Sequence, residues 1–215
     1  MTNTSAAARS AMQVTPLGDR VNVNSQGHSL RTDSAAVGLQ EALGRILDRA
    51  NTIATSSASK IITLELLDAT ARALRCELAV FWEVHPASKV LYAATIWKQS
   101  EATTQELERD TCARQLTIGE GIAGHVWRSL KTTWATDITR VMCLPRCIHA
   151  EQAGLGGGIW IPLKTVSAVY GVLELLGRQP IPAHADAVLA VERLAVSLGY
   201  LIEATLPDGF APRRT

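Results

Sequence analysis

The chain has 215 residues, of which 47% are apolar and 19% charged, a balance typical of a globular protein that buries one core without metal or disulfide cross-links. Its 21 basic and 20 acidic side chains form no block of like charge, so we expect no direct contact with nucleic acid. Because neither a membrane-spanning apolar stretch nor a signal peptide is evident, we expect a cytoplasmic protein whose four cysteines are reduced.

Both ends of the chain are predicted to lie outside a compact domain. Residues 1–33 are rich in Ser, Thr, Asn, Gly and Ala, a composition typical of a disordered tail. Residues 34–58 begin with apolar side chains at helical spacing and end in a linker rich in Thr, Ser and Ala. Residues 207–215 form a second patternless tail, so we assign the domain to residues 59–206.

The first half of the domain predicts one helix and two strands. Apolar residues from Leu64 to Leu74 recur at helical spacing. The apolar segments 78–84 and 90–97 are joined by a short Pro-containing connection, which requires antiparallel pairing. Residues 99–113 are polar and charged, and we expect an exposed loop or an irregular helix there.

The second half continues with a Gly-rich turn at residues 119–124, a short helix, a short strand that ends in Asp137, and a second short helix. A break at residues 156–158, three consecutive glycines to which we ascribe mobility, precedes two apolar strands and a long helix over 185–204. This order predicts an α+β fold with a central antiparallel sheet of about six strands, and we expect its helices to gather on one face.

The segment LTIGEGIAGHVWRSLKTTWATDI (116–138), followed by Pro145-Arg146 and the Gly-Val-Leu-Glu run at 171–174, resembles the GAF domain family, small-molecule sensors of bacterial signalling proteins. The resemblance extends over about residues 61–203. It implies a non-catalytic domain that binds a small molecule, pairs through its terminal helices as a parallel homodimer, and passes a signal to a partner protein in trans. We identify no kinase, cyclase or DNA-binding segment in the sequence.

The resemblance also implies a ligand pocket between the sheet and residues 131–158. Arg146 is expected to pair with a carboxylate or phosphate of the ligand. The sequence identifies neither the ligand nor a cofactor, and the aromatic residues concerned could equally belong to the core. The residues expected to line the pocket are Trp134, Asp137, Arg146, Cys147, His149 and Trp160.

Other chemistries remain open. Cys143 and Cys147 could serve a thiol enzyme or redox sensor resembling free methionine-R-sulfoxide reductases, although that family carries a cysteine in the turn where Ala123 stands. Cys147 could instead attach a bilin, as in cyanobacteriochromes. A dinucleotide site is disfavoured because the Gly-rich turn follows a charged segment and not a buried strand. We also predict no metal site, because no fourth ligand accompanies Cys143, Cys147 and His149. A purely structural dimerisation module is a further alternative.

Overall fold

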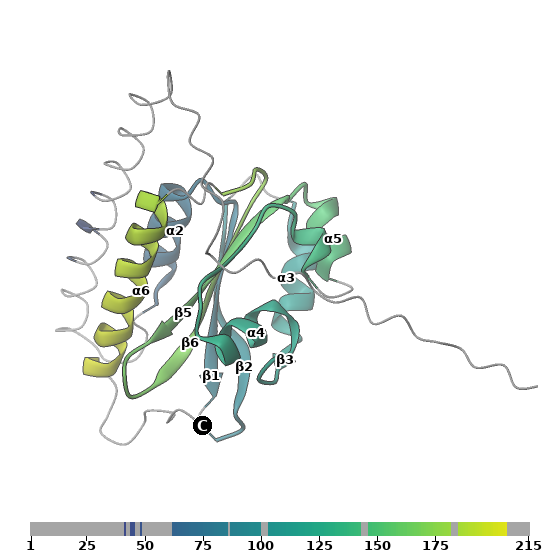
Figure 1. Ribbon diagram of the computed structural model, residues 1–215. Helices are drawn as coiled ribbons and strands as arrows, with labels where there is room; N and C mark the ends of the chain where they lie inside the picture. Colours follow the sequence, from purple (N-terminus) through teal and green to yellow (C-terminus); the bar gives the residue numbers. More distant parts are fainter. Residues whose placement is uncertain are drawn as a thin grey trace, which may run out of the picture.

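A computed structural model of the chain describes residues 62–85, 87–99, 103–142, 146–181 and 185–205, together with the helical positions 41, 44, 45 and 48. Its centre is a six-stranded sheet in the order β3-β2-β1-β6-β5-β4, in which every neighbouring pair is antiparallel (Figure 1). The predicted α+β fold is therefore confirmed. The strands are β1 (Leu78–His85), β2 (Val90–Lys98), β3 (Gln115–Leu116), β4 (Thr133–Ala135), β5 (Gly157–Lys164) and β6 (Val169–Gly177).

Helices precede, interrupt and follow the strands. None of the described helices is long and apolar enough to cross a membrane. The predicted tails 1–33 and 207–215 lie outside the described residues, as do all but four positions of the predicted helix and linker 34–58. The helices are α2 (Leu64–Ala73), α3 (Gln105–Cys112), α4 (Gly121–Ser129), the short 3₁₀ helix η1 (Ile138–Arg140), α5 (Arg146–Gln152) and α6 (Ala185–Thr205).

Helices cover both faces of the sheet, so the expectation that they gather on one face is wrong. Helices α2 and α6 lie on one side, and α3, α4 and α5 lie on the other (Figure 1). Consecutive strand residues show the reason: Ile159 belongs to the core under α2 and α6, whereas its neighbour Trp160 belongs to the opposite core, and both are fully buried. A strand buried on both faces reads as a continuous apolar run and does not reveal which side is covered.

Helix α3 occupies most of the segment expected to be a loop or an irregular helix. Its composition is polar because only a narrow stripe faces the sheet. Leu107 and Thr111, one helical turn apart, are buried in that stripe. The Thr111 hydroxyl satisfies its donor within the helix, on the Leu107 carbonyl oxygen at 2.6 Å.

The Gly-rich turn has the structural role that the sequence predicts. Gly119 adopts a left-handed φ of 87°, and a Cβ on Gly124 would lie 2.5 Å from the carbonyl oxygen of Thr117. Glu120 closes the turn before α4 by accepting hydrogen bonds from the backbone amide and the hydroxyl of Thr117, both at 2.9 Å.

The expected mobile break at residues 156–158 is wrong, because Gly157 and Gly158 are buried within β5 and pair with β6. A Cβ on Gly157 would approach the Gln179 carbonyl oxygen to 2.5 Å, and one on Gly158 would approach the Trp160 ring to 2.5 Å. The glycines therefore provide space for close packing, and a ligand is not needed to order this segment.

Candidate functional site

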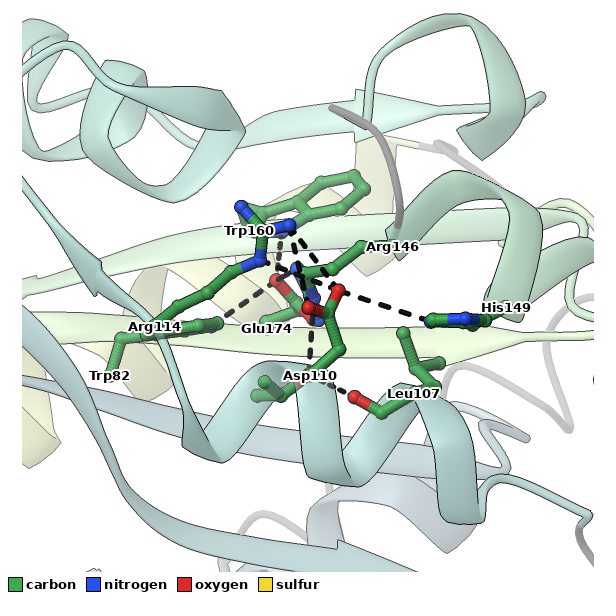
Figure 2. Close-up of polar contacts among 9 residues, drawn as sticks. Trp82, Leu107, Asp110, Arg114, Arg146, His149, Trp160 and Glu174 are labelled. Atoms are coloured by element: carbon green, nitrogen blue, oxygen red, sulfur yellow. Dashed lines mark hydrogen bonds and ion pairs between the residues drawn. The ribbon is translucent and has the colours of Figure 1, made fainter.

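A buried carboxylate, that of Glu174 on β6, lies on the sheet face covered by α3, α4 and α5. The side chain is 0% exposed, so its charge depends on protein donors. Its Oε2 accepts the indole N–H of Trp82 at 3.2 Å and that of Trp160 at 2.8 Å. Arg146 completes the set, with Nη1 on Oε2 at 3.2 Å and Nη2 on Oε1 (Figure 2). We call these four residues the buried cluster.

Arg146 links three elements of the fold. It is the first residue of α5 and is 4% exposed. Its Nη atoms contact Glu174 on the sheet, while its Nε donates to the Thr111 hydroxyl of α3 at 3.1 Å. The centre of the guanidinium lies 5.3 Å from the ring centroid of Trp82, which adds a cation–π contact.

A second polar group lies where α3 and α5 meet. The Asp110 carboxylate is 3.3 Å from Nη2 of Arg114 and 3.9 Å from Nδ1 of His149, so Asp110 sits between the two basic side chains (Figure 2). Their side chains are 19–23% exposed, in contrast to the closed cluster beneath. Nδ1 of His149 is itself buried and makes no hydrogen bond.

Four of the six residues expected to line the pocket come together on this side of the sheet. Arg146 and Trp160 meet at Glu174. His149 belongs to the outer group, and Cys147, half-buried, packs against the apolar core of the same face. The carboxylate that Arg146 contacts is thus supplied by the protein itself.

The other two expected residues lie elsewhere. Trp134 on β4 packs against the core under α2 and α6. Asp137 is exposed and begins η1, where it accepts from the amide of Thr139 at 3.1 Å and pairs with Arg140 at 2.9 Å. The hydrogen bond from the Thr139 hydroxyl is the main cause that lowers the pKa of Asp137. Both residues have local structural roles.

Sequence reasoning missed the centre of the cluster. Glu174 is the only charged side chain in the run VYGVLELLG of β6, and a lone charge in a strand buried on both faces is a usable signal. Trp82 lies in the apolar segment 78–84, which predicts a strand but does not reveal a polar partner for the indole N–H. Thr111 and Asp110 lay in the segment expected to be a loop or an irregular helix.

The described cysteines form no disulfide. Cys76 is buried against the core under α2 and α6, and burial raises the pKa of its thiol. Cys112, at the end of α3, is exposed, and Cys143 lies outside the described residues. Within the part of the chain that the structure describes, no three His, Cys, Asp or Glu side chains gather as they would around a metal ion.

No protein-family model and no curated protein sequence matches the chain. Solved structures do resemble it. A free methionine-R-sulfoxide reductase from Neisseria meningitidis, in complex with its substrate, is 21% identical with a TM-score of 0.55, over 80% of this chain and 92% of that one. The GAF domain of a phosphoenolpyruvate-protein phosphotransferase from Coxiella burnetii is 15% identical with a TM-score of 0.55, over 76% and 94%.

The GAF domain of an Acinetobacter phosphoenolpyruvate-protein phosphotransferase is 16% identical with a TM-score of 0.51, over 76% of this chain and 91% of that one. At such identities the similarity concerns the fold. The domain therefore has the GAF fold, which some enzymes share.

Proposed function

We propose that this domain is a non-catalytic sensor in signal transduction, which binds a small molecule between the sheet and helices α3 and α5. The observation that carries the proposal is the buried cluster. A buried ion pair contributes little net stability because desolvation offsets the attraction between its charges. Two charges and two indole donors gathered at one point under two short helices therefore support a role in recognition.

The test of ligand binding starts from protein purified from its own source organism. Native mass spectrometry reports the subunit number and the mass of any retained molecule together. A ligand found in this way, or by a thermal-shift screen of metabolites, is expected to stabilise the protein and to lose this effect in Glu174→Gln. The matched control is Glu151→Gln, since Glu151 is an exposed carboxylate on α5 outside the cluster. Equal ligand effects in both variants would place the binding site elsewhere.

We further propose that the signal leaves through α6 in a parallel homodimer that acts on a partner protein in trans, in the cytoplasm. The inner face of α6 packs on the sheet through Leu194 and Leu198. Its outer face carries a stripe, Leu189, Val196 and Tyr200, whose side chains are 43%, 52% and 53% exposed. A stripe of this kind suits a helix that pairs with a second helix.

Val196→Glu is expected to convert the dimer into a folded monomer, as measured by light scattering and circular dichroism. Val166→Glu, the same substitution at a 79% exposed position in the β5–β6 hairpin, is the control and should leave the dimer intact. A dimer that persists in Val196→Glu would exclude this face.

A second candidate function follows from the similarity to free methionine-R-sulfoxide reductase. In that case Cys143 and Cys147 would act as a redox pair, either in catalysis or in sensing. Turnover of free methionine-R-sulfoxide, coupled to thioredoxin and NADPH, should then be lost in Cys143→Ser/Cys147→Ser. Turnover that is absent from the wild type, or unchanged in the double variant, excludes this thiol enzyme. A covalent mass on Cys147 would instead support bilin attachment.

A further inference from the structure

The sheet supplies a carboxylate and two aromatic rings at one place. Glu174 and Trp160 are directly opposite each other on β6 and β5, and Trp82 reaches the same carboxylate from β1. All three side chains are 0% exposed and all are held by strands. A carboxylate beside an aromatic face is the chemistry that recognises a cationic nitrogen.

The cation now held there comes from a separate element. Arg146 begins α5, a helix of seven residues that packs against α3 and η1. The side chain of Ile148 on α5 is 45% exposed, so the protein covers only one side of this helix. The carboxylate site is therefore part of the rigid sheet, whereas its occupant belongs to a small peripheral helix.

The sign of the charges decides which ligands could enter. The Arg146–Glu174 pair is neutral as a unit, and a ligand cation in place of the guanidinium preserves that neutrality. An anion that approached Arg146 would also approach Glu174, and the repulsion of like charges is strong where water is excluded. A neutral ligand in place of the guanidinium would leave the Glu174 carboxylate as an uncompensated buried charge, which is strongly destabilising.

The displaced guanidinium also has an alternative partner. Asp110 precedes Thr111, the α3 residue that now accepts from Nε of Arg146, and its carboxylate is partly exposed beside Arg114 and His149. An Arg146 side chain that left the interior could pair with this carboxylate and so remain associated with α3.

From these observations we infer that the Arg146 guanidinium is a built-in occupant of a cation site formed by Glu174, Trp82 and Trp160. The ligand is then a small molecule with a guanidinium or ammonium group that replaces it and releases α5. This inference rests on the proposed sensor function and specifies its ligand class and its switch. The two states are Arg146 bound and Arg146 displaced, and the ligand selects the second.

If Arg146 occupies the ligand site, its removal should strengthen ligand binding, whereas removal of an arginine that contacts the ligand should weaken it. When a protein side chain occupies a binding site, the apparent affinity for an external ligand is reduced in proportion to the fraction of molecules in which the site is free. Arg146→Ala is therefore expected to bind methylguanidinium at least about tenfold more tightly than the wild type. Binding is measured by calorimetry and thermal shift, with sodium chloride at equal ionic strength and urea, a neutral molecule of similar shape, as controls.

The double variant Arg146→Ala/Glu174→Gln should show no such binding, because the carboxylate is gone. Weaker binding by Arg146→Ala than by the wild type would mean that Arg146 contacts the ligand, and would overturn the inference. Equal binding, or none in either protein, would overturn it as well.

Should Arg146→Ala not fold alone, its refolding from urea is compared with methylguanidinium and with sodium chloride present. Folded protein recovered only with methylguanidinium supports the inference, whereas equal recovery, or recovery in neither, overturns it.

Failure of the sensor function has a different signature. A wild type that retains an anionic or neutral metabolite, while Arg146→Ala gains no affinity for cations, refutes the cation site alone. A wild type that binds no small molecule refutes the sensor function.

Discussion

Removal of the Arg146 charge should destabilise the domain far more than removal of both charges of its pair. In Arg146→Met the new side chain fills the volume of the alkyl stem, but Glu174 stays buried at 0% exposure with only the two indole donors. Breaking a buried pair in this way costs about 3–5 kcal/mol. In Arg146→Met/Glu174→Gln the amide oxygen still accepts from Trp82 and Trp160, and stability should return to within about 1 kcal/mol of the wild type.

The assay is urea unfolding followed by circular dichroism and tryptophan fluorescence, together with thermal melts. For a protein of this size the single variant corresponds to a fall in Tm of about 6–20 °C. Arg140→Met is the matched control, because Arg140 pairs with Asp137 at 83% side-chain exposure and should change stability by less than about 0.5 kcal/mol. The reasoning is refuted if Arg146→Met costs less than about 1 kcal/mol, or if the double variant is as unstable as the sum of its parts.

Three further predictions test the fold around the cluster. Gly158→Ala should destabilise by about 1–3 kcal/mol, seen as a lower Tm, because the new Cβ would lie 2.5 Å from the buried Trp160 ring; an unchanged Tm would contradict the packing of β5. Iodoacetamide should label the exposed Cys112 in native protein but Cys76 only in urea, as mapped by peptide mass spectrometry, and rapid native labelling of Cys76 would contradict its burial. Burial, together with a hydrogen bond to Glu83 on the neighbouring strand, raises the pKa of Tyr92 to about 12. The protonated Tyr92 therefore stabilises the folded state fully below about pH 10, and this contribution is lost as the pH rises toward 12. Urea midpoints should therefore fall less over this range in Tyr92→Phe, and equal falls would argue against the shift.

Much of the fold could be predicted from local patterns. The apolar runs that became β1, β5 and β6, and the periodic stripe of α6, are long and regular enough to identify. Helix α3 was harder, because in eight residues it buries only Leu107 and Thr111. The side covered by each helix could not be predicted either, since strands buried on both faces carry no alternation.

The candidate site could be predicted only in part, because its contacts are distant in sequence. Glu174 is 28 residues from Arg146 and 92 from Trp82, and strand register and helix packing bring them together. The family resemblance pointed to Arg146 and Trp160 but treated the partner of Arg146 as a ligand group. The partner in the structure is a protein carboxylate, and only the register of β6 against β1 and β5 reveals it.

The same register provides a physical route from the cluster to α6. Along β5, Trp160 donates to Glu174 on one face while its neighbours Ile159 and Ile161 pack under α6 on the other. Helix α6 lies against β5 at backbone level, since a Cβ on Gly199 would be 2.2 Å from the Lys164 carbonyl oxygen. At this point no side chain of Gly199 separates α6 from β5, so we expect a shift of β5 to reach α6. Contact alone does not make a pathway, because coupling also needs an element with two discrete states. In our proposal the Arg146 side chain is that element: its position inside or outside the cluster changes the partners of the Glu174 carboxylate, which also accepts the indole N–H of Trp160 on β5, the strand on which α6 rests.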